Sequence, residues 1–311
     1  MTTKINELKY KTFKHLGVNE LGKASDNIKE IHEVLGYDFG EEVILKEKSQ
    51  ISTEYEVHDT WAVTRDSYAI DKNDSFEFGI CYTGDMNHAV NLRLHIKENA
   101  KAKVCLIFNM LDCDLLGKID IKIEENAELE FAPLFIMGEN VIMNIHMSLA
   151  GENSKFHMEG GYIFEGNNIA DINVQANHSK NSESIINMHG ILLENSKKTY
   201  KYTLDFPRGS TNAKGSESER VIALADNFKN IVVPVLLVGE DNIEASHGAE
   251  ITQFDKEKLD YMYSRGINKE TAEFMSVKTE LSPVIDMNNA RGKEIIKNRL
   301  FEIFPGGDNE I

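Results

Sequence analysis

The residues best suited to chemistry lie in the segment "EDNIEASHGAEI", residues 240–251. It places Glu244 and Glu250 on either side of His247, at steps of three residues. Glutamate and histidine are ligands that zinc and iron accept. On a straight strand Glu244 and His247 would point to opposite faces, whereas at the corner of a solenoid both side chains could reach one site. The spacing alone favours a charged turn with an exposed histidine.

The three cysteines are a second source of possible ligands. Cys81, Cys105 and Cys113 form no CxxC pair, and an odd number of cysteines argues against a disulfide framework. Cys105, in "KVCLIF", is predicted to be a core residue. Cys113 lies between two aspartates, which disfavour its thiolate. We predict structural roles for all three, and their participation in a metal site stays open.

Other motifs carry less information. Residues 206–220, "FPRGSTNAKGSESER", lack the GxxxxGK[ST] spacing of a phosphate-binding loop and are predicted to form a solvated connection. We find no nucleophile–base–acid order of the kind that hydrolases use. Four further histidines occur in alternating segments and are expected to make inward polar contacts or to lie on the surface: His146, His157, His178 and His189.

Composition limits the possible partners and location. The chain has 311 residues, of which 41% are hydrophobic, and a net charge of −17. So acidic a surface repels nucleic acid and anionic lipid, and neither is expected as a partner. No apolar run approaches the ~20 residues that span a bilayer, and the first residues lack the apolar stretch of a signal peptide. We therefore predict a cytoplasmic protein.

From about residue 40, apolar and polar residues alternate with the period of a strand that buries one face. "IKENAKAKV" begins at Ile96 and "IEENAELEF" begins at Ile123, an offset of 27 residues. A fixed period with a polar turn is typical of a β-solenoid, and asparagine tolerates the left-handed backbone of such turns. We predict an all-β core that forms a parallel β-helix. An antiparallel β-sandwich would not need a repeated register, which extends to Glu98, Glu125 and Glu152, and to Asn99, Asn126 and Asn153.

Helical patterns flank the strands, so we divide the chain into an N-terminal helical segment (1–39), the β-helix core (40–254) and a C-terminal helical segment (255–311). The C-terminal helices are expected either to cap the open end of the solenoid or to form a docking surface. The predicted helix caps and stops are Ser25 or Asp26, Gly36, Asp255, Gly266, Asn268, and Ser282 followed by Pro283 at the first helical position.

The segment "PVLLVGEDNIEASHGAEITQFDKEKLDYMYSRGINKETA" resembles the C-terminal core of the SufB/SufD family. The matching features are Pro234, the acidic pair Glu240–Asp241, the tetrapeptide "SHGA" and the later "YMYSRGI". The resemblance implies a right-handed parallel β-helix flanked by helical segments. It also implies a dimer with itself or a SufB/SufD paralogue, an ABC-type ATPase (SufC) bound through the C-terminal helices, and a role in assembling iron–sulfur clusters with a sulfur donor.

The resemblance also assigns site residues. His247 falls at the histidine that the family uses at its dimer interface as a candidate ligand for iron or a cluster. Val232, Val233 and Pro234 occupy the stretch where SufB has a cysteine, and Gly248 stands where SufB has a glutamate. In both respects the chain resembles SufD. It also resembles short single-component versions, which often carry a glutamate at the position of Glu244. The resemblance thus implies His247 and Glu244 as ligands of iron or a transient iron–sulfur cluster, with Glu250 behind them.

Three functions follow as hypotheses. The first is a non-enzymatic scaffold that works with the ATPase, and weak, exchangeable ligands would suit a scaffold that releases its product. The second is an enzyme on a β-helix, either a polysaccharide lyase or a metal-dependent hydrolase, which the fold alone does not exclude. The single tryptophan, Trp61, and the lack of a basic stripe disfavour a carbohydrate groove. The third is a purely structural subunit of the assembly complex.

Overall fold

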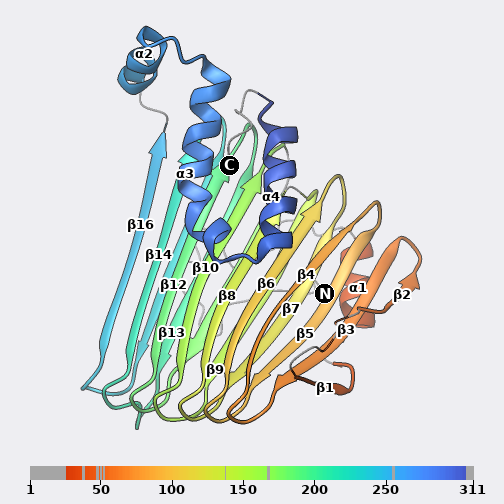
Figure 1. Cartoon of the computed structure of the whole chain (residues 1–311), viewed down its shortest axis with the longest axis vertical. Coiled ribbons are helices and arrows are strands. Elements are labelled where there is room, and N and C mark those ends of the chain that lie inside the picture. The colour runs from red at the N-terminus through yellow and green to blue at the C-terminus, as the bar shows by residue number, and fades with distance from the viewer. Residues whose placement is uncertain are drawn as a thin grey trace.

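The computed structural model describes residues 26–305 except 37–38, 47–48, 50, 52, 137, 167–168 and 254–255. Successive strands alternate between two sheets that face each other across an apolar lumen, and they build the flattened solenoid of Figure 1. The nine-stranded sheet contains β1 (Glu42–Leu45), β2 (Tyr55–His58), β3 (Trp61–Ile70), β5 (Asn87–Ile96), β7 (Leu115–Ile123), β9 (Asn140–Leu149), β11 (Ile169–Asn177), β13 (Lys197–Phe206) and β15 (Lys229–Val238). The seven-stranded sheet contains β4 (Ser75–Gly84), β6 (Lys101–Met110), β8 (Glu128–Ile136), β10 (Lys155–Phe164), β12 (Glu183–Leu192), β14 (Lys214–Ala223) and β16 (Glu244–Gln253).

The strand pairs within both sheets are parallel, apart from β2, which runs antiparallel to β3. Ile96 of β5 pairs with Ile123 of β7, and both side chains are fully buried in the lumen. Ile70 and Leu149 extend the same row into the neighbouring coils. This stacking confirms the predicted parallel β-helix and excludes the antiparallel sandwich.

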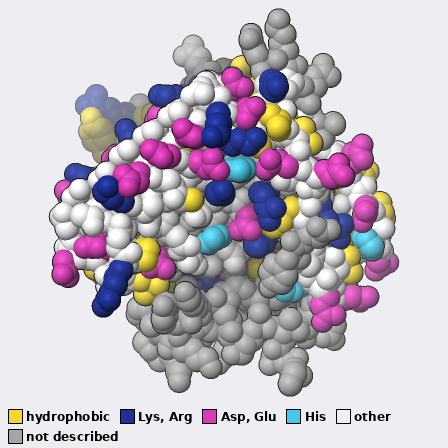
Figure 2. Space-filling view, turned by 90° about the horizontal axis from the view of Figure 1, so that it is seen from below, with side chains coloured by type: hydrophobic (Ala, Val, Ile, Leu, Met, Phe, Trp, Pro, Cys, Tyr) yellow, Lys and Arg dark blue, Asp and Glu magenta, His cyan; other side chains and the backbone are white. Residues whose placement is uncertain are grey.

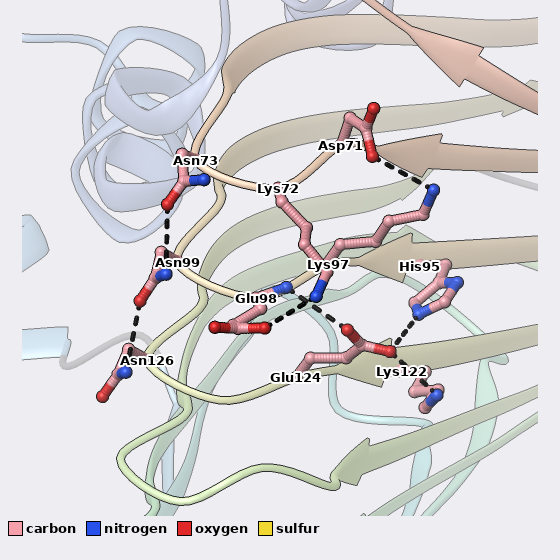
Figure 3. Close-up of polar contacts among 10 residues, drawn as sticks. All are labelled: Asp71, Lys72, Asn73, His95, Lys97, Glu98, Asn99, Lys122, Glu124 and Asn126. Carbon is pink, nitrogen blue, oxygen red and sulfur yellow. Dashed lines mark hydrogen bonds and ion pairs between the residues drawn. The ribbon is translucent and has the colours of Figure 1, made fainter.

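Asparagine turns explain the 27-residue period. Asn99, Asn126 and Asn153 each adopt a left-handed backbone, with φ between 54° and 58°. Their side chains form a ladder, because the Nδ2 of Asn126 donates to Oδ1 of Asn99 over 3.2 Å and Asn153 donates to Asn126 over 3.0 Å. Figure 3 shows this ladder reaching Asn73, beside ion pairs such as Lys72–Glu98. Where the lower end of the solenoid is described, charges of both signs are interspersed (Figure 2).

Helix α1 (Asp26–Leu35) covers the first coils. Ile28, Ile31 and Leu35 pack against Trp61 and Val63 on the outer face of the nine-stranded sheet. The helix is followed by Gly36 at φ +55°, which confirms the predicted helix and its stop. Of the two proposed caps, Ser25 lies outside the described residues.

Three helices follow the solenoid: α2 (Lys256–Ser264), α3 (Lys269–Met287) and α4 (Ala290–Ile303). The predicted Asn268 cap is confirmed, since its side chain accepts a hydrogen bond from the backbone N–H of Thr271. Gly266, at φ +83°, follows the end of α2 as predicted, whereas the proposed Asp255 cap lies outside the described residues. Figure 1 shows α3 and α4 lying across the seven-stranded sheet.

The helix predicted to begin at Ser282 and Pro283 was placed wrongly. Helix α3 continues through both residues, and α4 begins later, after the cap Asn289. A proline inside a helix removes the amide that would bond the carbonyl four residues earlier. Here the hydroxyl of Ser282 donates to that carbonyl, the O of Thr279, over 2.8 Å. Ser282 and Pro283 therefore do not start a helix here, and α3 continues through them while it packs on the sheet.

The last coil is left open. Helix α3 contacts β8, β10, β12 and β14, but β16 stays exposed along nearly its whole length. Two large apolar side chains on these last strands are about half exposed, Val238 at 57% and Ile251 at 48%. Of the two roles expected for the C-terminal helices, they do not cap this end in the described part of the chain. No helix among the described residues is long and apolar enough to cross a membrane.

Candidate functional site at the open terminal coil

The pairing of β16 with β14 decides where the predicted ligands point. Ala245 packs against the lumen core, so odd-numbered residues of β16 face inward and even-numbered residues face outward. Glu244 and Glu250 therefore point outward, where they form exposed ion pairs with Lys214 at 2.9 Å and Arg220 at 3.6 Å. His247 faces the lumen. The strand is regular at this point, and within one chain Glu244 and His247 lie on opposite faces.

The strand beneath β16 supplies carboxylates to the same lumen. His247 pairs in register with Glu217, whose side chain is 3% exposed and whose two oxygens have no hydrogen-bond partner among the described residues. Burial raises the pKa of Glu217 well above its usual value, and the neighbouring Glu219 raises it further. Glu219, at 2% exposure, is bonded by the ammonium of Lys198 and by the hydroxyl of Tyr162 at 2.8 Å. Its second oxygen is buried without a partner in the described structure.

The facing sheet adds more unpaired groups. The hydroxyls of Tyr200 and Tyr202 and both amide atoms of Asn230 are buried without a partner among the described residues. Even-numbered residues of β13 and β15, such as Lys198 and Val232, face the lumen, and all three of these residues are even-numbered. Buried polar groups in proteins are nearly always hydrogen-bonded, so this concentration indicates a place built for water or a ligand. Carboxylate and phenol oxygens beside an imidazole suit a hard or borderline cation.

Glu217 and Glu219 were not predicted as site residues from the sequence. Residues 214–220 were predicted to belong to a solvated connection, and that prediction was wrong, because they form most of β14. The signal was nevertheless available. Counting back by twos from the apolar Val221 and Ala223 assigns Glu219 and Glu217 to the buried face. The alternation of buried and exposed residues in β14 was not recognised because charged residues occur on both of its faces.

The cysteines lie elsewhere. Cys81 is on β4, Cys105 on β6, and Cys113 follows β6 at the edge of the solenoid. Five strand spacings, about 24 Å, separate β6 from β16, so none of the three can join His247 within one chain. Burial and the surrounding aspartates raise the pKa of Cys113, as predicted. Among the described residues, no group of three or more histidine, cysteine or acidic side chains is arranged to hold a metal within a single chain.

A buried histidine connects α3 to the sheet. His189 of β12 contacts Glu280 of α3 through Nδ1 at 2.8 Å and Glu159 of β10 through Nε2 at 2.9 Å. Burial opposes the charge on this imidazole, but the two carboxylates outweigh it and raise the pKa of His189 to about 9. The row continues from Glu159 to Asn187 at 2.9 Å and to Ser218 at 2.6 Å. These hydrogen bonds run from α3 to Ser218 of β14, the strand next to β16, where Ser218 is in register with Gly248.

A comparison with known protein families matches the part of the chain that contains the open terminal coil. A family model described as "SUF system FeS cluster assembly, SufBD core domain" matches residues 58–279, from the end of β2 into α3. The chain belongs to the SufBD family. The match includes β14, β15 and β16, and with them the whole open coil. The resemblance inferred from the sequence is confirmed.

Three relatives place the chain among SufBD proteins. It is 26% identical to the iron–sulfur cluster assembly protein SufD of Bacillus subtilis over 162 residues, which are 52% of this chain and 37% of the relative. It is 22% identical to SufD of Escherichia coli over 191 residues, 60% of this chain and 45% of the relative. It is 23% identical to SufB of Bacillus subtilis over 205 residues, 65% of this chain and 44% of the relative. The chain spans less than half the length of the relatives it matches.

Proposed function

We propose that this SufBD protein is a non-enzymatic scaffold subunit that holds iron or a nascent iron–sulfur cluster where two chains meet at their open terminal coils. The observation that carries the proposal is the position of His247 above Glu217, a buried carboxylate without a partner in the described chain. The sulfide of the cluster would come from a separate sulfur donor. Iron is the cargo of this site, so ligands that exchange readily suit the task better than a full set of thiolates.

The open coil supports the pairing of two chains. β15 and β16 end their respective sheets, so each leaves backbone donors and acceptors without a strand partner in the described structure. Such edges pair readily with another chain, and the exposed Val238 and Ile251 supply apolar area beside them. A twofold axis would bring the same patch of both chains together. The second chain in this proposal is a copy of this one or a SufB/SufD paralogue.

Two chains would double the ligand set. Each would contribute His247 from its last strand and Glu217 from the lumen beneath it. Glu244 and Glu250 face outward, where they form ion pairs with Lys214 and Arg220. In this proposal they contribute to the shared site only from the second chain, and these ion pairs must break before they bind iron. We therefore place His247 and Glu217 at the centre of the proposed site and Glu244 and Glu250 at its rim.

We propose that α2 and α3 dock a SufC-like ABC-type ATPase. The support is an exposed group of large side chains on these helices, with Tyr261 60%, Tyr263 40% and Met275 46% exposed. Exposed apolar and aromatic side chains on helices favour a protein partner. The ion pair between Glu280 and His189 would hold α3 in place on the sheet while the partner is bound.

Anaerobic reconstitution with iron and sulfide tests the proposed site. We expect His247→Ala and Glu217→Gln to lose most of the bound iron and sulfide, and Glu244→Ala to lose less. The matched control is Glu152→Gln, which alters an exposed carboxylate at an asparagine turn. Sedimentation would show whether each variant remains a dimer. The proposed site is wrong if His247→Ala and Glu217→Gln stay dimeric and bind as much iron as the parent.

The docking surface has its own test. Met275→Glu and Tyr261→Glu change exposed side chains of the full chain and leave its core intact. We expect both variants to lose most of their co-purification with the ATPase, and Lys180→Glu, at an exposed asparagine turn, to retain it. Equal recovery of the ATPase with all three variants would move the docking surface away from α2 and α3.

A further inference from the structure

Two of the three cysteines line one cavity. Gly79 of β4 pairs with Cys105 of β6, and Cys81 follows two residues after Gly79, so both thiols lie on the outer face of the seven-stranded sheet. They line a cavity of about 320 Å³ between this face, the start of α4 and the segment near Ile51. Cys105 is buried and Cys81 is partly exposed.

The start of α4 gives this cavity a positive character. Arg291 lies in the first turn of the 14-residue helix and lines the cavity with the capping residue Asn289. The positive end of a helix dipole stabilises negative charge placed near it. Asn288 also lines the cavity; it is 2% exposed, and its Oδ1 is buried without a partner in the described structure. The remaining walls include Ile51, Ile107 and Ile295.

The chemistry of the lining narrows the possible ligands. No histidine, aspartate or glutamate is among the described residues that line the cavity, so a hard divalent cation finds no carboxylate and a tetrahedral zinc ion lacks two of its four ligands. Two thiolates match a soft, monovalent, two-coordinate ion such as Cu(I). Two thiolates and one such ion carry a net charge of −1, which Arg291 and the start of α4 would offset.

A direct disulfide fits this geometry less well. Neighbouring strands are ~4.8 Å apart and alternate residues ~6.6 Å apart, which puts the two cysteine Cα atoms about 8 Å apart along the diagonal. A disulfide requires less than about 7 Å. An ion between the sulfurs spans the gap, because two metal–thiolate bonds add roughly 4.6 Å. Burial raises the pKa of both thiols, against the effect of Arg291 on Cys81. Binding of a metal displaces the protons of its thiol ligands.

We propose that Cys81 and Cys105 form a binding site for one soft monovalent metal ion of the Cu(I) class. Each thiol releases one proton and each sulfur donates an electron pair to the ion, with no change of oxidation state. Arg291 balances the charge of the resulting bis-thiolate. Cys105 lies five strand spacings from the strand of His247 and Cys81 lies six, so the site is separate from the proposed iron site.

Anaerobic titration of the full chain with Cu(I), in competition with a chromogenic Cu(I) chelator, tests the proposal. We expect one tightly bound equivalent in the parent, and binding weaker by at least tenfold in Cys81→Ser and Cys105→Ser. Cys113→Ser is the matched control and should bind like the parent. Arg291→Gln should bind more weakly than the parent but more tightly than Cys81→Ser. Copper-edge X-ray absorption should show two sulfur ligands.

Cys105 is fully buried, so its serine variant needs a thermal unfolding measurement before its binding is compared. Cys81 is partly exposed, and Cys81→Ser with an unchanged melting temperature decides the question alone. Parent-like Cu(I) binding by folded Cys81→Ser overturns the proposal. An equal loss in Cys113→Ser, or an absorption spectrum with nitrogen or oxygen ligands, overturns it as well.

Discussion

The middle and the terminal coils share one backbone plan but contain different lumens. In the middle coils, from β6 to β9, the lumen is apolar, and Phe108 and Phe135 stack there at 5.1 Å between ring centroids. In the terminal coils the equivalent space holds Glu217 and Glu219, with Lys198, tyrosine hydroxyls and unpaired oxygens. The coil geometry continues unchanged through both, because the strand pairing and the asparagine turns set it. What fills the lumen is therefore free to differ where function requires it.

The difference has an energetic meaning. Burying a polar group without a hydrogen bond costs about 1–3 kcal/mol, and more for a charge. A sequence that keeps several such groups in one place, next to an apolar middle lumen, accepts lower stability there. The first coils contain a smaller set of this kind, in Asp66, Tyr82 and His88. Departures of this kind concentrate at functional sites. Among the described residues, the unpaired buried groups of the lumen are most numerous in the terminal coils.

The largest expected effect is in the apolar lumen. Ile123→Asp would place an unpaired charge between Ile96 and Leu149, and we expect a loss of several kcal/mol, enough to unfold the solenoid. Urea unfolding followed by circular dichroism measures it. Lys122→Asp, one residue earlier and outward-facing, is the control and should fold. If Ile123→Asp folds and unfolds cooperatively in urea, the lumen at Ile123 tolerates a buried charge, and the proposed difference between the two lumens is wrong.

Breaking the buried ion pair of the terminal lumen should come next. Lys198→Met leaves the carboxylate of Glu219 without its cation in a site closed to solvent, and we expect the free energy of unfolding to fall by about 3–5 kcal/mol. The double variant Lys198→Met with Glu219→Met should recover most of the loss, because no charge then remains unpaired. A double variant as unstable as the single one would show that the loss comes from packing.

The ion pairs of His189 with Glu280 and Glu159, beneath α3, should make the free energy of unfolding depend on pH. His189 has a pKa of about 9 in the folded chain and about 6.5 when unfolded, so its contribution is complete below pH 6.5 and is lost as the pH rises through 9. The shift corresponds to on the order of 3 kcal/mol. Glu159, with a pKa of about 2, acts oppositely and loses its contribution as the pH falls below about 4.5.

Urea unfolding at pH 6 and pH 9.5 measures this dependence. Stability should fall between the two values in the parent, and the fall should be smaller in His189→Gln, which carries no titrating group at this position. The same fall in parent and variant would mean that other groups cause it.

Replacing Glu217 should change the free energy of unfolding least, and it should raise that free energy where the other changes lower it. Glu217→Leu removes a buried acid that lacks a partner in the described chain, and we expect the free energy of unfolding to rise by about 1–3 kcal/mol. Iron binding after reconstitution should fall in the same variant. The matched change in the apolar lumen, Met143→Leu, should leave both quantities nearly unchanged. A Glu217→Leu variant less stable than the parent would show that the carboxylate has a partner.

Much of the fold could be predicted because it is written in short, repeated patterns. The 27-residue offset of Ile96 and Ile123 and the left-handed asparagines that recur at turns are local features, and local features decide a solenoid. The start of the last helix could not be predicted from Ser282 and Pro283. That boundary depends on how α3 packs across β8, β10 and β12, which no local signal reports.

The site was less accessible to sequence reasoning. His247 was found through its motif, but the pairing with Glu217 joins residues 30 positions apart and depends on the length of a whole coil. The ion pair of His189 with Glu280 joins residues 91 positions apart and needs the placement of α3. Glu244 and His247 are three residues apart in the sequence, and the alternation of an ordinary strand places them on opposite faces. Local spacing is informative only once the secondary structure is known.

The most direct test of the central claim is iron-edge anomalous diffraction from a crystal of the protein loaded anaerobically with Fe(II) and sulfide. We predict that the iron peak lies at the open terminal coil, where His247 and Glu217 of two chains meet, and that Glu217→Gln weakens or removes it. An iron peak in the cavity of Cys81 and Cys105, or a peak at the terminal coil bound without His247 or Glu217, would contradict the claim that the terminal lumen is built to hold iron.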